Sequence, residues 1–257
     1  SVEQPLRYYD NNINSLITLL RCMEQYGVQH LVFSSSCTVY GQPTAEHLPI
    51  TESAPRQDAT SPYGNTKRIN EDIIIDSVRS GMPLQAVILR YFNPIGAHSS
   101  ALIGEEPVGT PQNLIPFLTQ TVAGLRKELV VFGNDYNTPD GTCIRDYIDV
   151  MDLAQAHLAA LRRLHRSDVQ TDPAHYIYNV GMGRGLSVLE LIQAFERATG
   201  RKVPYRMGDR RAGDIEQIWA DTSYGEQELQ WHAEIPIEES LRRAWHWQEA
   251  LDKRHIN

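Results

Sequence analysis

The stretch HLVFSSS (residues 30–36) decides the fold, because an apolar run of strand length leads directly into three serines. It follows NINSLITLLRCMEQY (12–26), in which apolar residues recur at steps of three and four, the period of an amphipathic helix. A second apolar run, LQAVILRYF (84–92), follows a helical stretch that opens at Ser61-Pro62. Buried strands separated by helical crossovers predict a parallel, doubly wound α/β sheet of the Rossmann type.

The rest of the chain alternates more loosely. Further helices are expected over about 114–126, 150–164, 187–199 and 237–251, and strands over LVVF (129–132), CIRDYI (143–148) and HYIYNV (175–180). The long loop over 96–113 and the turn-rich GNDYNTPDGT have the length and composition typical of ligand-binding connections. GMGRG (181–185) lacks the third glycine of a dinucleotide motif and predicts a tight turn before the helix.

Composition excludes several classes of protein. The 257 residues carry 24 Lys and Arg against 32 Asp and Glu, a net charge of −8, which argues against nucleic acid or an anionic membrane as the main partner. No apolar run approaches the roughly 18 residues that a membrane-spanning helix needs. Cys22, Cys37 and Cys143 fit neither a disulfide framework nor a metal site, so we expect a cytoplasmic protein without a metal.

The clearest chemical signal is Tyr63-Gly-Asn-Thr-Lys67 at the start of a predicted helix. Residues four apart lie on one helical face, so the ammonium is expected to lower the pKa of the phenol and make a general base. Ser36 ends the preceding strand, where open α/β sheets place ligands, and its hydroxyl could share a proton with the tyrosine. The plain alternatives are an amphipathic pair at a helix start and a serine turn.

Six motifs then occur in order: VFSSSCTVYG, SPYGNTK, LRYFNPIGAH, TPQNLIPF, VFGNDYNTPDGTCIRDYI and RRAGD. Together they resemble the UDP-galactose (UDP-glucose) 4-epimerase family of the extended short-chain dehydrogenase/reductase superfamily, over essentially the whole chain. The resemblance implies an NAD-dependent exchange of UDP-galactose and UDP-glucose by removal of hydride from C4, rotation of the 4-keto sugar and return of the hydride. It also implies a homodimer packed through helices such as 12–26 and 62–80.

The resemblance assigns a role to each matching residue. Tyr63 is the expected base, Lys67 holds the nicotinamide ribose, and Ser36 bridges to the sugar. The cofactor contacts implied are Asn11, Ser36, Tyr63, Lys67 and Phe92. The nucleotide-sugar contacts implied are Asn93, Asn113, Leu114, Val130, Phe132, Arg145, Arg211, Asp214 and Ile218.

The resemblance also implies which parts of the chain form the cofactor domain and which form the nucleotide-sugar lobe. Residues 1–92 are expected to form part of a Rossmann-like cofactor and catalytic domain, to which about 143–180 return. Residues about 93–142 and 181–257 are expected to form a smaller mixed α/β lobe for the nucleotide sugar. The family's opening strand and G-x-x-G-x-x-G turn have no match in this chain; if it is the complete polypeptide, exposed strand edges predict poor solubility or self-association.

Other departures bear on the activity. Asp149 stands where the family commonly has His, and Ile218 occupies a position linked to use of N-acetylated sugars, which leaves those sugars undecided. A nucleotide-sugar 4,6-dehydratase would carry an Asp-Glu pair where this chain has Cys37-Thr38. A catalytically silent UDP-sugar-binding chain is the other alternative, and it would bind UDP without NAD.

Overall fold

The computed structural model describes residues 1–166, 174–211 and 213–256. The chain forms two compact units, each built from separated segments. Unit 1 comprises Ser1–Phe92, Gln155–Gly183 and Ile218–His232, and unit 2 comprises Asn93–Ala154, Arg184–Gln217 and Ala233–Asn257. These bounds place 143–154 with unit 2 and 218–232 with unit 1, unlike the division expected from the sequence, and the binding role of each unit stays a prediction.

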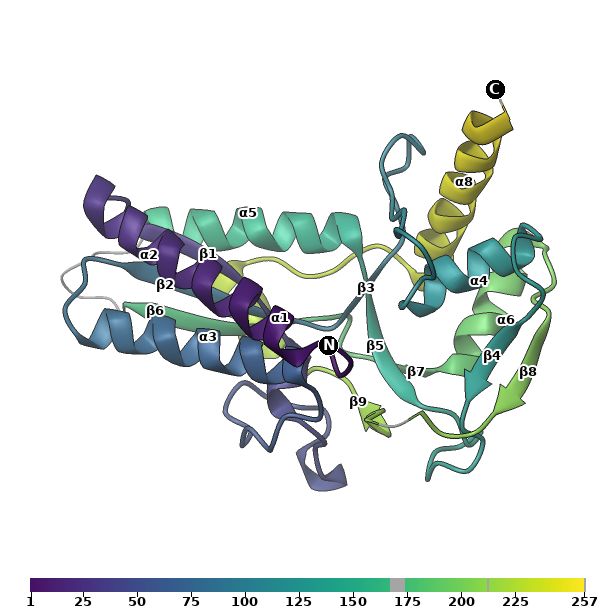
Figure 1. The fold of residues 1–257 in the computed structure, drawn as a ribbon, viewed down its shortest axis with the longest axis horizontal. Helices are drawn as coiled ribbons and strands as arrows, with labels where there is room; N and C mark the ends of the chain where they lie inside the picture. Colours follow the sequence, from purple (N-terminus) through teal and green to yellow (C-terminus); the bar gives the residue numbers. More distant parts are fainter. Residues whose placement is uncertain (167–173, 212, 257) are drawn as a thin grey trace. The chain divides into compact units, whose positions relative to one another are not determined.

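Unit 1 is an α/β layer structure around a parallel sheet in the order β1-β2-β6 (Figure 1). Its strands are β1 (His30–Ser36), β2 (Gln85–Tyr91) and β6 (His175–Val180). Its helices are α1 (Pro5–Tyr9), the π-helical turn η1 (Asp10–Asn14), α2 (Ser15–Tyr26), α3 (Pro62–Arg79), α7 (Ser223–Leu229) and the later part of α5 (Val150–Arg166), with short 3-10 turns η2 (Cys37–Tyr40) and η3 (Ala45–His47). The predicted α/β class with parallel strands is confirmed.

Helices cover both faces of this sheet. Neighbouring side chains of a strand point in opposite directions, so consecutive serines of β1 contact helices on opposite faces. Ser34 Oγ lies 3.2 Å from His157 Nε2 of α5, whereas Ser35 Oγ donates to Glu71 Oε1 of α3 at 2.5 Å. On the α3 face, Leu16, Leu20 and Met23 of α2 pack with Leu31, Ile74, Leu84, Ala86 and Ile88. The register pairs Ser36 with Tyr91, so the serine run ends at the carboxyl edge of the sheet, as the sequence predicts.

Unit 2 has smaller sheets covered by three helices. Its elements are β3 (Asn93–Ile95), α4 (Leu114–Val122), β4 (Leu129–Phe132), β5 (Ile144–Asp149), β7 (Gly185–Ser187), α6 (Val188–Thr199), β8 (Tyr205–Gly208) and α8 (Ile237–Ile256), with β9 (Gln217–Ile218) at the boundary between the units. β3 runs parallel to β5, β7 is antiparallel to β5, and β4 pairs with β8 in parallel.

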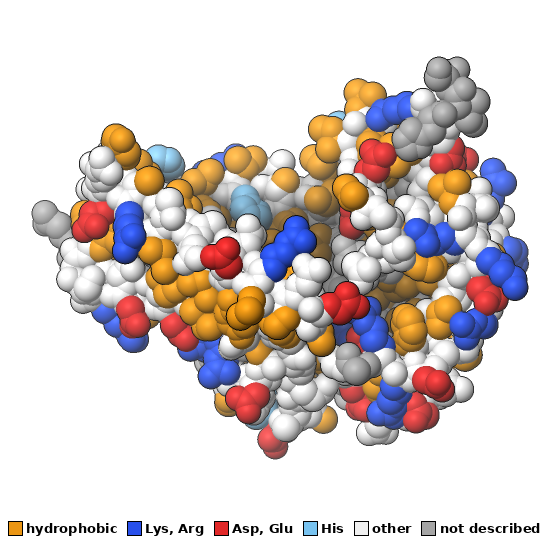
Figure 2. All heavy atoms as spheres, in the orientation of Figure 1, with side chains coloured by type: hydrophobic (Ala, Val, Ile, Leu, Met, Phe, Trp, Pro, Cys, Tyr) orange, Lys and Arg blue, Asp and Glu red, His pale blue; other side chains and the backbone are white. Residues whose placement is uncertain are grey.

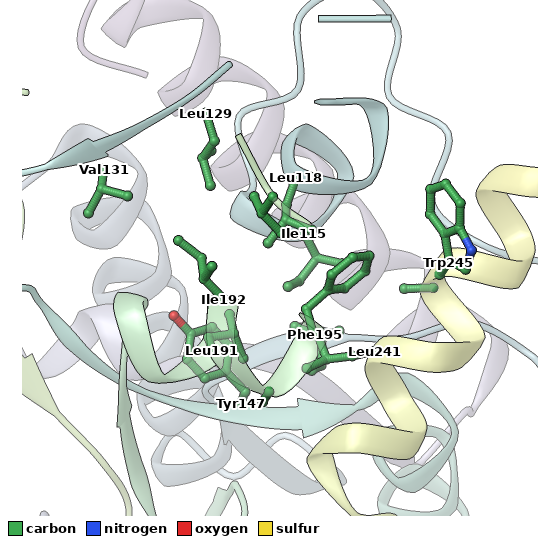
Figure 3. Close-up of a cluster of buried hydrophobic side chains, with 14 residues drawn as sticks. Ile115, Leu118, Leu129, Val131, Tyr147, Leu191, Ile192, Phe195, Leu241 and Trp245 are labelled. Atoms are coloured by element: carbon green, nitrogen blue, oxygen red, sulfur yellow. The ribbon is translucent and has the colours of Figure 1, made fainter. Parts of the chain in front are cut away.

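One apolar cluster forms the core of unit 2 (Figure 3). It takes Ile115 and Leu118 from α4, Leu129 and Val131 from β4, Tyr147 from β5, Leu191, Ile192 and Phe195 from α6, and Leu241 and Trp245 from α8. Because β4 alternates, Val130 and Phe132 face away from this core. Phe132 is 44% exposed, and an apolar ring with that exposure is available to a ligand.

Several element boundaries differ from those expected. The π-turn takes up the first three residues of the helix predicted over 12–26, so α2 begins at Ser15, and the helix predicted over 114–126 ends at Val122. Ser187 caps α6 through a capping box with Glu190, as its position in the sequence suggests, but a short strand, β7, stands directly before it. β8 and α7 were not expected, because RKVPYRMG lacks a strand-like apolar alternation and α7 has no side-chain cap.

Among the described residues, no helix is both long and apolar enough to cross a membrane, and no group of three metal-ligating side chains occurs. The cytoplasmic location stays a prediction.

Candidate active site

Three predicted site residues of unit 1 meet at the carboxyl edge of its sheet. Ser36 is the last residue of β1, and its hydroxyl is close enough to the phenol of Tyr63 to lower the pKa of that phenol. Ser36 Oγ accepts hydrogen bonds from Thr38 N at 3.2 Å and from Thr38 Oγ1 at 3.0 Å. Since both acceptor positions of the serine oxygen are then used, its own proton remains for one further hydrogen bond.

Local sequence explains why Tyr63 comes so close to β1. Ser61 caps α3 by accepting from Gly64 N at 3.2 Å, and Pro62 supplies the fixed φ of the first helical residue. A Cβ on Gly64 would lie 3.2 Å from Thr38 O, so glycine lets the first turn of α3 approach η2 closely. Tyr63 is thereby held beside the end of β1.

Lys67 lies one turn further along α3. Its Nζ donates to Ser34 O at 2.8 Å and lies 5.7 Å from the centre of the Tyr63 ring. An ammonium has three N–H donors, so within the described residues two remain for a ligand. Burial lowers the pKa of Lys67.

The pKa of the phenol differs from the sequence expectation. Burial raises the pKa of Tyr63 to about 12, and the hydrogen bond from Ser36 only partly offsets this effect. The prediction that Lys67 lowers the pKa of Tyr63 is therefore wrong. The ammonium is directed to the Ser34 carbonyl, and burial removes water from around the phenol.

The other two predicted cofactor residues occupy different surroundings in unit 1. Asn11 lies exposed in the π-turn, and its Nδ2 donates to Asn12 Oδ1 at 3.1 Å. Phe92 follows β2, is 3% exposed, and donates its N–H to Val180 O at 3.1 Å. Phe92 is therefore packed in the interior at the end of β2, whereas the Asn11 amide is accessible to solvent.

The predicted arginines and aspartate gather in unit 2. Arg145 of β5 and the exposed Arg211 both lower the pKa of the Asp214 carboxyl, while its burial, the larger effect, raises that pKa. The neighbouring Arg210 is committed elsewhere, since its Nε donates to Asp135 Oδ1 at 2.7 Å and its guanidinium stacks on Tyr136. Arg211, adjacent to the undescribed Ala212, is the arginine of this motif that is available to an anion.

The remaining predicted contacts are distributed over unit 2 and the boundary strand. Val130 and Phe132 share the outer face of β4, where Gly208 leaves room, because a Cβ there would lie 2.6 Å from Val130 Cγ1. Asn113 precedes Leu114 at the start of α4, and its Nδ2 donates to Glu105 Oε1 at 2.7 Å. The other two predicted residues are Asn93, exposed at the start of β3, and Ile218, 1% exposed in β9.

Comparison with known proteins gives a consistent result. A family model described as GDP-mannose 4,6 dehydratase matches residues 1–244. UDP-glucose 4-epimerase 2 from Arabidopsis thaliana is 51% identical over 247 residues, which are 96% of this chain and 69% of that protein. The human UDP-glucose 4-epimerase is 46% identical over 248 residues, with the same coverage.

The chain belongs to the UDP-glucose 4-epimerase family. A solved UDP-glucose 4-epimerase from Stenotrophomonas maltophila, with bound NAD and formylated UDP-arabinopyranose, superposes with a TM-score of 0.93 at 48% identity, covering 99% of this chain and 73% of that one. The enzyme from Bifidobacterium longum, in complex with NAD⁺ and UDP, gives 0.91 at 45% identity, covering 97% and 72%.

A buried charge network lies beside the predicted site residues of β1 and α3, and sequence reasoning missed it. Arg90 of β2 donates to both carboxylate oxygens of Glu71, at 2.9 and 2.6 Å, and to Tyr40 Oη at 3.1 Å. Glu71 in turn accepts from Ser35, next to Ser36. An arginine inside the otherwise apolar run AVILRY was the available signal, because a buried charge requires a partner.

Proposed function

We propose that this protein interconverts UDP-galactose and UDP-glucose in an NAD-dependent reaction. The observation that carries the proposal is the Tyr63 phenol held against Ser36, with Lys67 one turn away, at the carboxyl edge of a parallel sheet. Membership of the UDP-glucose 4-epimerase family supports the same reaction.

In this proposal Tyr63 moves the proton. Its phenolate oxygen takes the proton of the C4 hydroxyl of the sugar as the carbonyl forms, and returns that proton when the hydroxyl is restored. Ser36 stabilises the phenolate with its hydrogen bond, because its lone pairs are already occupied by Thr38. Its single proton can serve the sugar oxygen only when it is not donated to the phenolate.

The polar groups of unit 1 fit a nicotinamide nucleotide. The two remaining N–H donors of Lys67 and the accessible amide of Asn11 suit the hydroxyl groups of a ribose. NAD, when bound, would take up the hydride removed from C4 and supply it again to the opposite face of the 4-keto sugar. Lys67 then has two tasks, since it holds the ribose and places a positive charge near the phenolate.

Unit 2 supplies groups suited to UDP. Phe132 presents an exposed ring on which a flat base can stack, and Val130 lies on the same face. Arg145 and Arg211 provide guanidinium groups for a diphosphate, which an acidic chain must recruit locally. Asn93, Asn113, Leu114 and Asp214 are assigned to the remaining contacts with the nucleotide sugar, and Ile218 to sugar selection.

We also propose a homodimer packed through α2 and α3. Figure 2 shows apolar side chains on the surface over these helices. Leu19 and Tyr26 of α2 are 47% and 74% exposed, which a second copy of the chain would cover. Sedimentation should give a dimer, and a monomer at all concentrations would refute this part of the proposal.

The two alternatives differ in observable ways. A 4,6-dehydratase needs an acid and a base beside the sugar, whereas Thr38 binds Ser36 and Cys37 is buried, and neither is a carboxylic acid. The other alternative is a silent UDP-sugar-binding chain. Such a chain would bind UDP and contain no NAD.

The test measures cofactor, turnover and binding together. The purified protein is denatured and its supernatant is assayed for NAD, and the native protein is assayed for conversion of UDP-galactose to UDP-glucose. About one NAD per chain with turnover supports the proposal, and Tyr63→Phe should abolish turnover while UDP still binds. UDP binding without NAD or turnover would support the silent alternative, and unchanged turnover of Tyr63→Phe would refute the assigned base.

A further inference from the structure

Four residues of unit 1 form a continuous chain of hydrogen bonds that ends on the backbone of Tyr63. Asn11 Nδ2 donates to Asn12 Oδ1 at 3.1 Å, and Asn12 Nδ2 donates to Thr66 Oγ1 at 2.9 Å. Thr66 Oγ1 donates to Tyr63 O at 2.7 Å. The chain therefore links the π-turn to the first turn of α3.

The directions of these bonds leave Thr66 little freedom. A hydroxyl has one proton, and because Thr66 Oγ1 accepts from Asn12, that proton is free to point at Tyr63 O. Thr66 is fully buried, so water does not compete for its hydroxyl. Replacing or turning Asn12 would therefore also loosen the bond to Tyr63.

The π-turn is itself held against α3. The buried Asn70 of α3 donates from Nδ2 to Asn12 O at 3.1 Å, and Asn65 donates from Nδ2 to Tyr9 Oη at 2.7 Å. π-helical turns are rare, and they occur frequently at functional sites because they re-aim side chains. Here the turn over Asp10–Asn14 presents Asn12 to Thr66.

We propose that Thr66 and Asn12 are positioning residues that fix the phenol of Tyr63 for proton transfer. Tyr63 lies in the first turn of α3, where helices fray. The Thr66 hydroxyl holds the carbonyl of Tyr63 by a hydrogen bond, and the hydrogen bond from Asn12 orients that hydroxyl. The inference rests on the proposed function, because it assigns these two residues to the base of that reaction.

The first experiment compares Thr66→Val with Thr66→Ser. Valine keeps the shape of threonine and removes the hydroxyl, so kcat should fall about tenfold while KM for the UDP-sugar stays within about twofold, since misplacement of a reacting group acts on the chemical step. Serine keeps the hydroxyl and should restore kcat. The matched control is Thr121→Val in α4, a buried threonine whose Oγ1 donates to Phe117 O at 2.8 Å.

The second experiment is a double-mutant cycle. Asn12→Ala should lower kcat in the same direction as Thr66→Val, and the double variant should be no slower than Thr66→Val alone, because both changes break one chain. If the fold losses of kcat of the two single variants multiply in the double variant, the two residues act separately and the proposal is overturned. Equal kcat values for Thr66→Val and Thr66→Ser would also overturn it.

An activity-independent readout separates this inference from the proposed function. Amide hydrogen exchange in the peptide that covers 62–67 should accelerate in Thr66→Val and Asn12→Ala, and stay unchanged in Thr121→Val. Absence of turnover in the unmodified protein would refute the proposed function. Unchanged exchange in Thr66→Val would refute the positioning inference, whatever the turnover.

Discussion

Arg90 and Glu71 form a bidentate ion pair in the interior of unit 1, with 2.9 Å between Arg90 Nε and Glu71 Oε1 and 2.6 Å between Nη2 and Oε2. Glu71 is fully buried and Arg90 is 3% exposed; Glu71 also accepts from Ser35 and lies 3.6 Å from Arg56 Nη1, and Arg90 also donates to Tyr40 Oη and Glu52 O. The pair joins α3, which carries Tyr63, to the sheet, which carries Ser36. Its loss should therefore affect both stability and the site.

Glu71→Gln is expected to lower the free energy of unfolding by about 3–5 kcal/mol, because the buried charge of Arg90 would lose the carboxylate that neutralises it. Asp76→Asn is the matched control on the same helix, since Asp76 lies 3.9 Å from Arg79 in an exposed pair and should cost at most about 1 kcal/mol. Denaturant unfolding of both variants checks the difference. Equal losses would contradict the role of the buried pair.

The pH dependence of turnover should follow the phenol of Tyr63. Its pKa is raised to about 12, so the phenolate fraction, and with it kcat, should increase from pH 6 to pH 9. Ser36→Ala removes the hydrogen bond that lowers this pKa, so kcat should fall and the profile should move to higher pH. Ser77→Ala, which removes a hydroxyl bonded to Ile73 O at the far end of α3, should leave the profile in place.

A profile that is flat in the unmodified protein, or that moves to lower pH in Ser36→Ala, would contradict the proton path through these two residues.

Alkaline conditions should destabilise the fold. Burial raises the pKa of Tyr147 well above the value of about 10 for a tyrosine in an unfolded chain. Above pH 10 the folded state keeps a proton that the unfolded state has lost, so the free energy of unfolding falls as pH rises, by up to about 1.4 kcal/mol per pH unit for each such tyrosine. Below pH 10 the folded and unfolded states both keep the Tyr147 proton, so the free energy of unfolding does not depend on this group.

Tyr147→Phe should therefore flatten the fall in unfolding free energy between pH 10 and pH 12, whatever its effect at neutral pH. Tyr26→Phe is the control, because Tyr26 is 74% exposed and its removal should not change the slope. Unfolding curves at several alkaline pH values give both slopes. The same slope in Tyr147→Phe as in the unmodified protein would refute the assignment.

Local sequence was sufficient for the elements that hold Ser36 and Tyr63. Ser36 and Tyr63 belong to contiguous motifs, an apolar run that ends in serines and a capped helix start, and parallel pairing of β1 and β2 follows from two buried runs with a helix between them. The outward direction of Phe132 likewise follows from strand alternation. These features depend on residues that are close in the sequence.

Features that depend on tertiary contacts were not predictable in this way. The π-turn at Asp10–Asn14 interrupts a 3.6-residue pattern without a sequence marker, and the link from Asn12 to Thr66 joins residues 54 apart. The pKa of Tyr63 was expected to be low because the spacing to Lys67 shows proximity but not burial, and burial is the larger effect. The polar and largely exposed β8 is defined only by its pairing with β4.

The outer face of β4 leads to a prediction about nucleotide binding. Phe132 and Tyr205 are both aromatic, both 44% exposed, and lie on the paired strands β4 and β8. Phe132→Ala should weaken UDP binding about tenfold, because stacking of a base on an aromatic ring contributes about 1–3 kcal/mol. Its melting temperature should change little, since the ring is outside the core cluster.

Tyr205→Ala is the matched control, and it should bind UDP as the unmodified protein does. Calorimetric titration with UDP and with inorganic diphosphate separates the base from the phosphates, because loss of Phe132 should weaken UDP and leave diphosphate unchanged. Arg211→Met should weaken both ligands, since its guanidinium is assigned to the phosphates that they share. Equal weakening of UDP in Phe132→Ala and Tyr205→Ala would show that the effect arises from the strand pair and would exclude a uracil contact at Phe132.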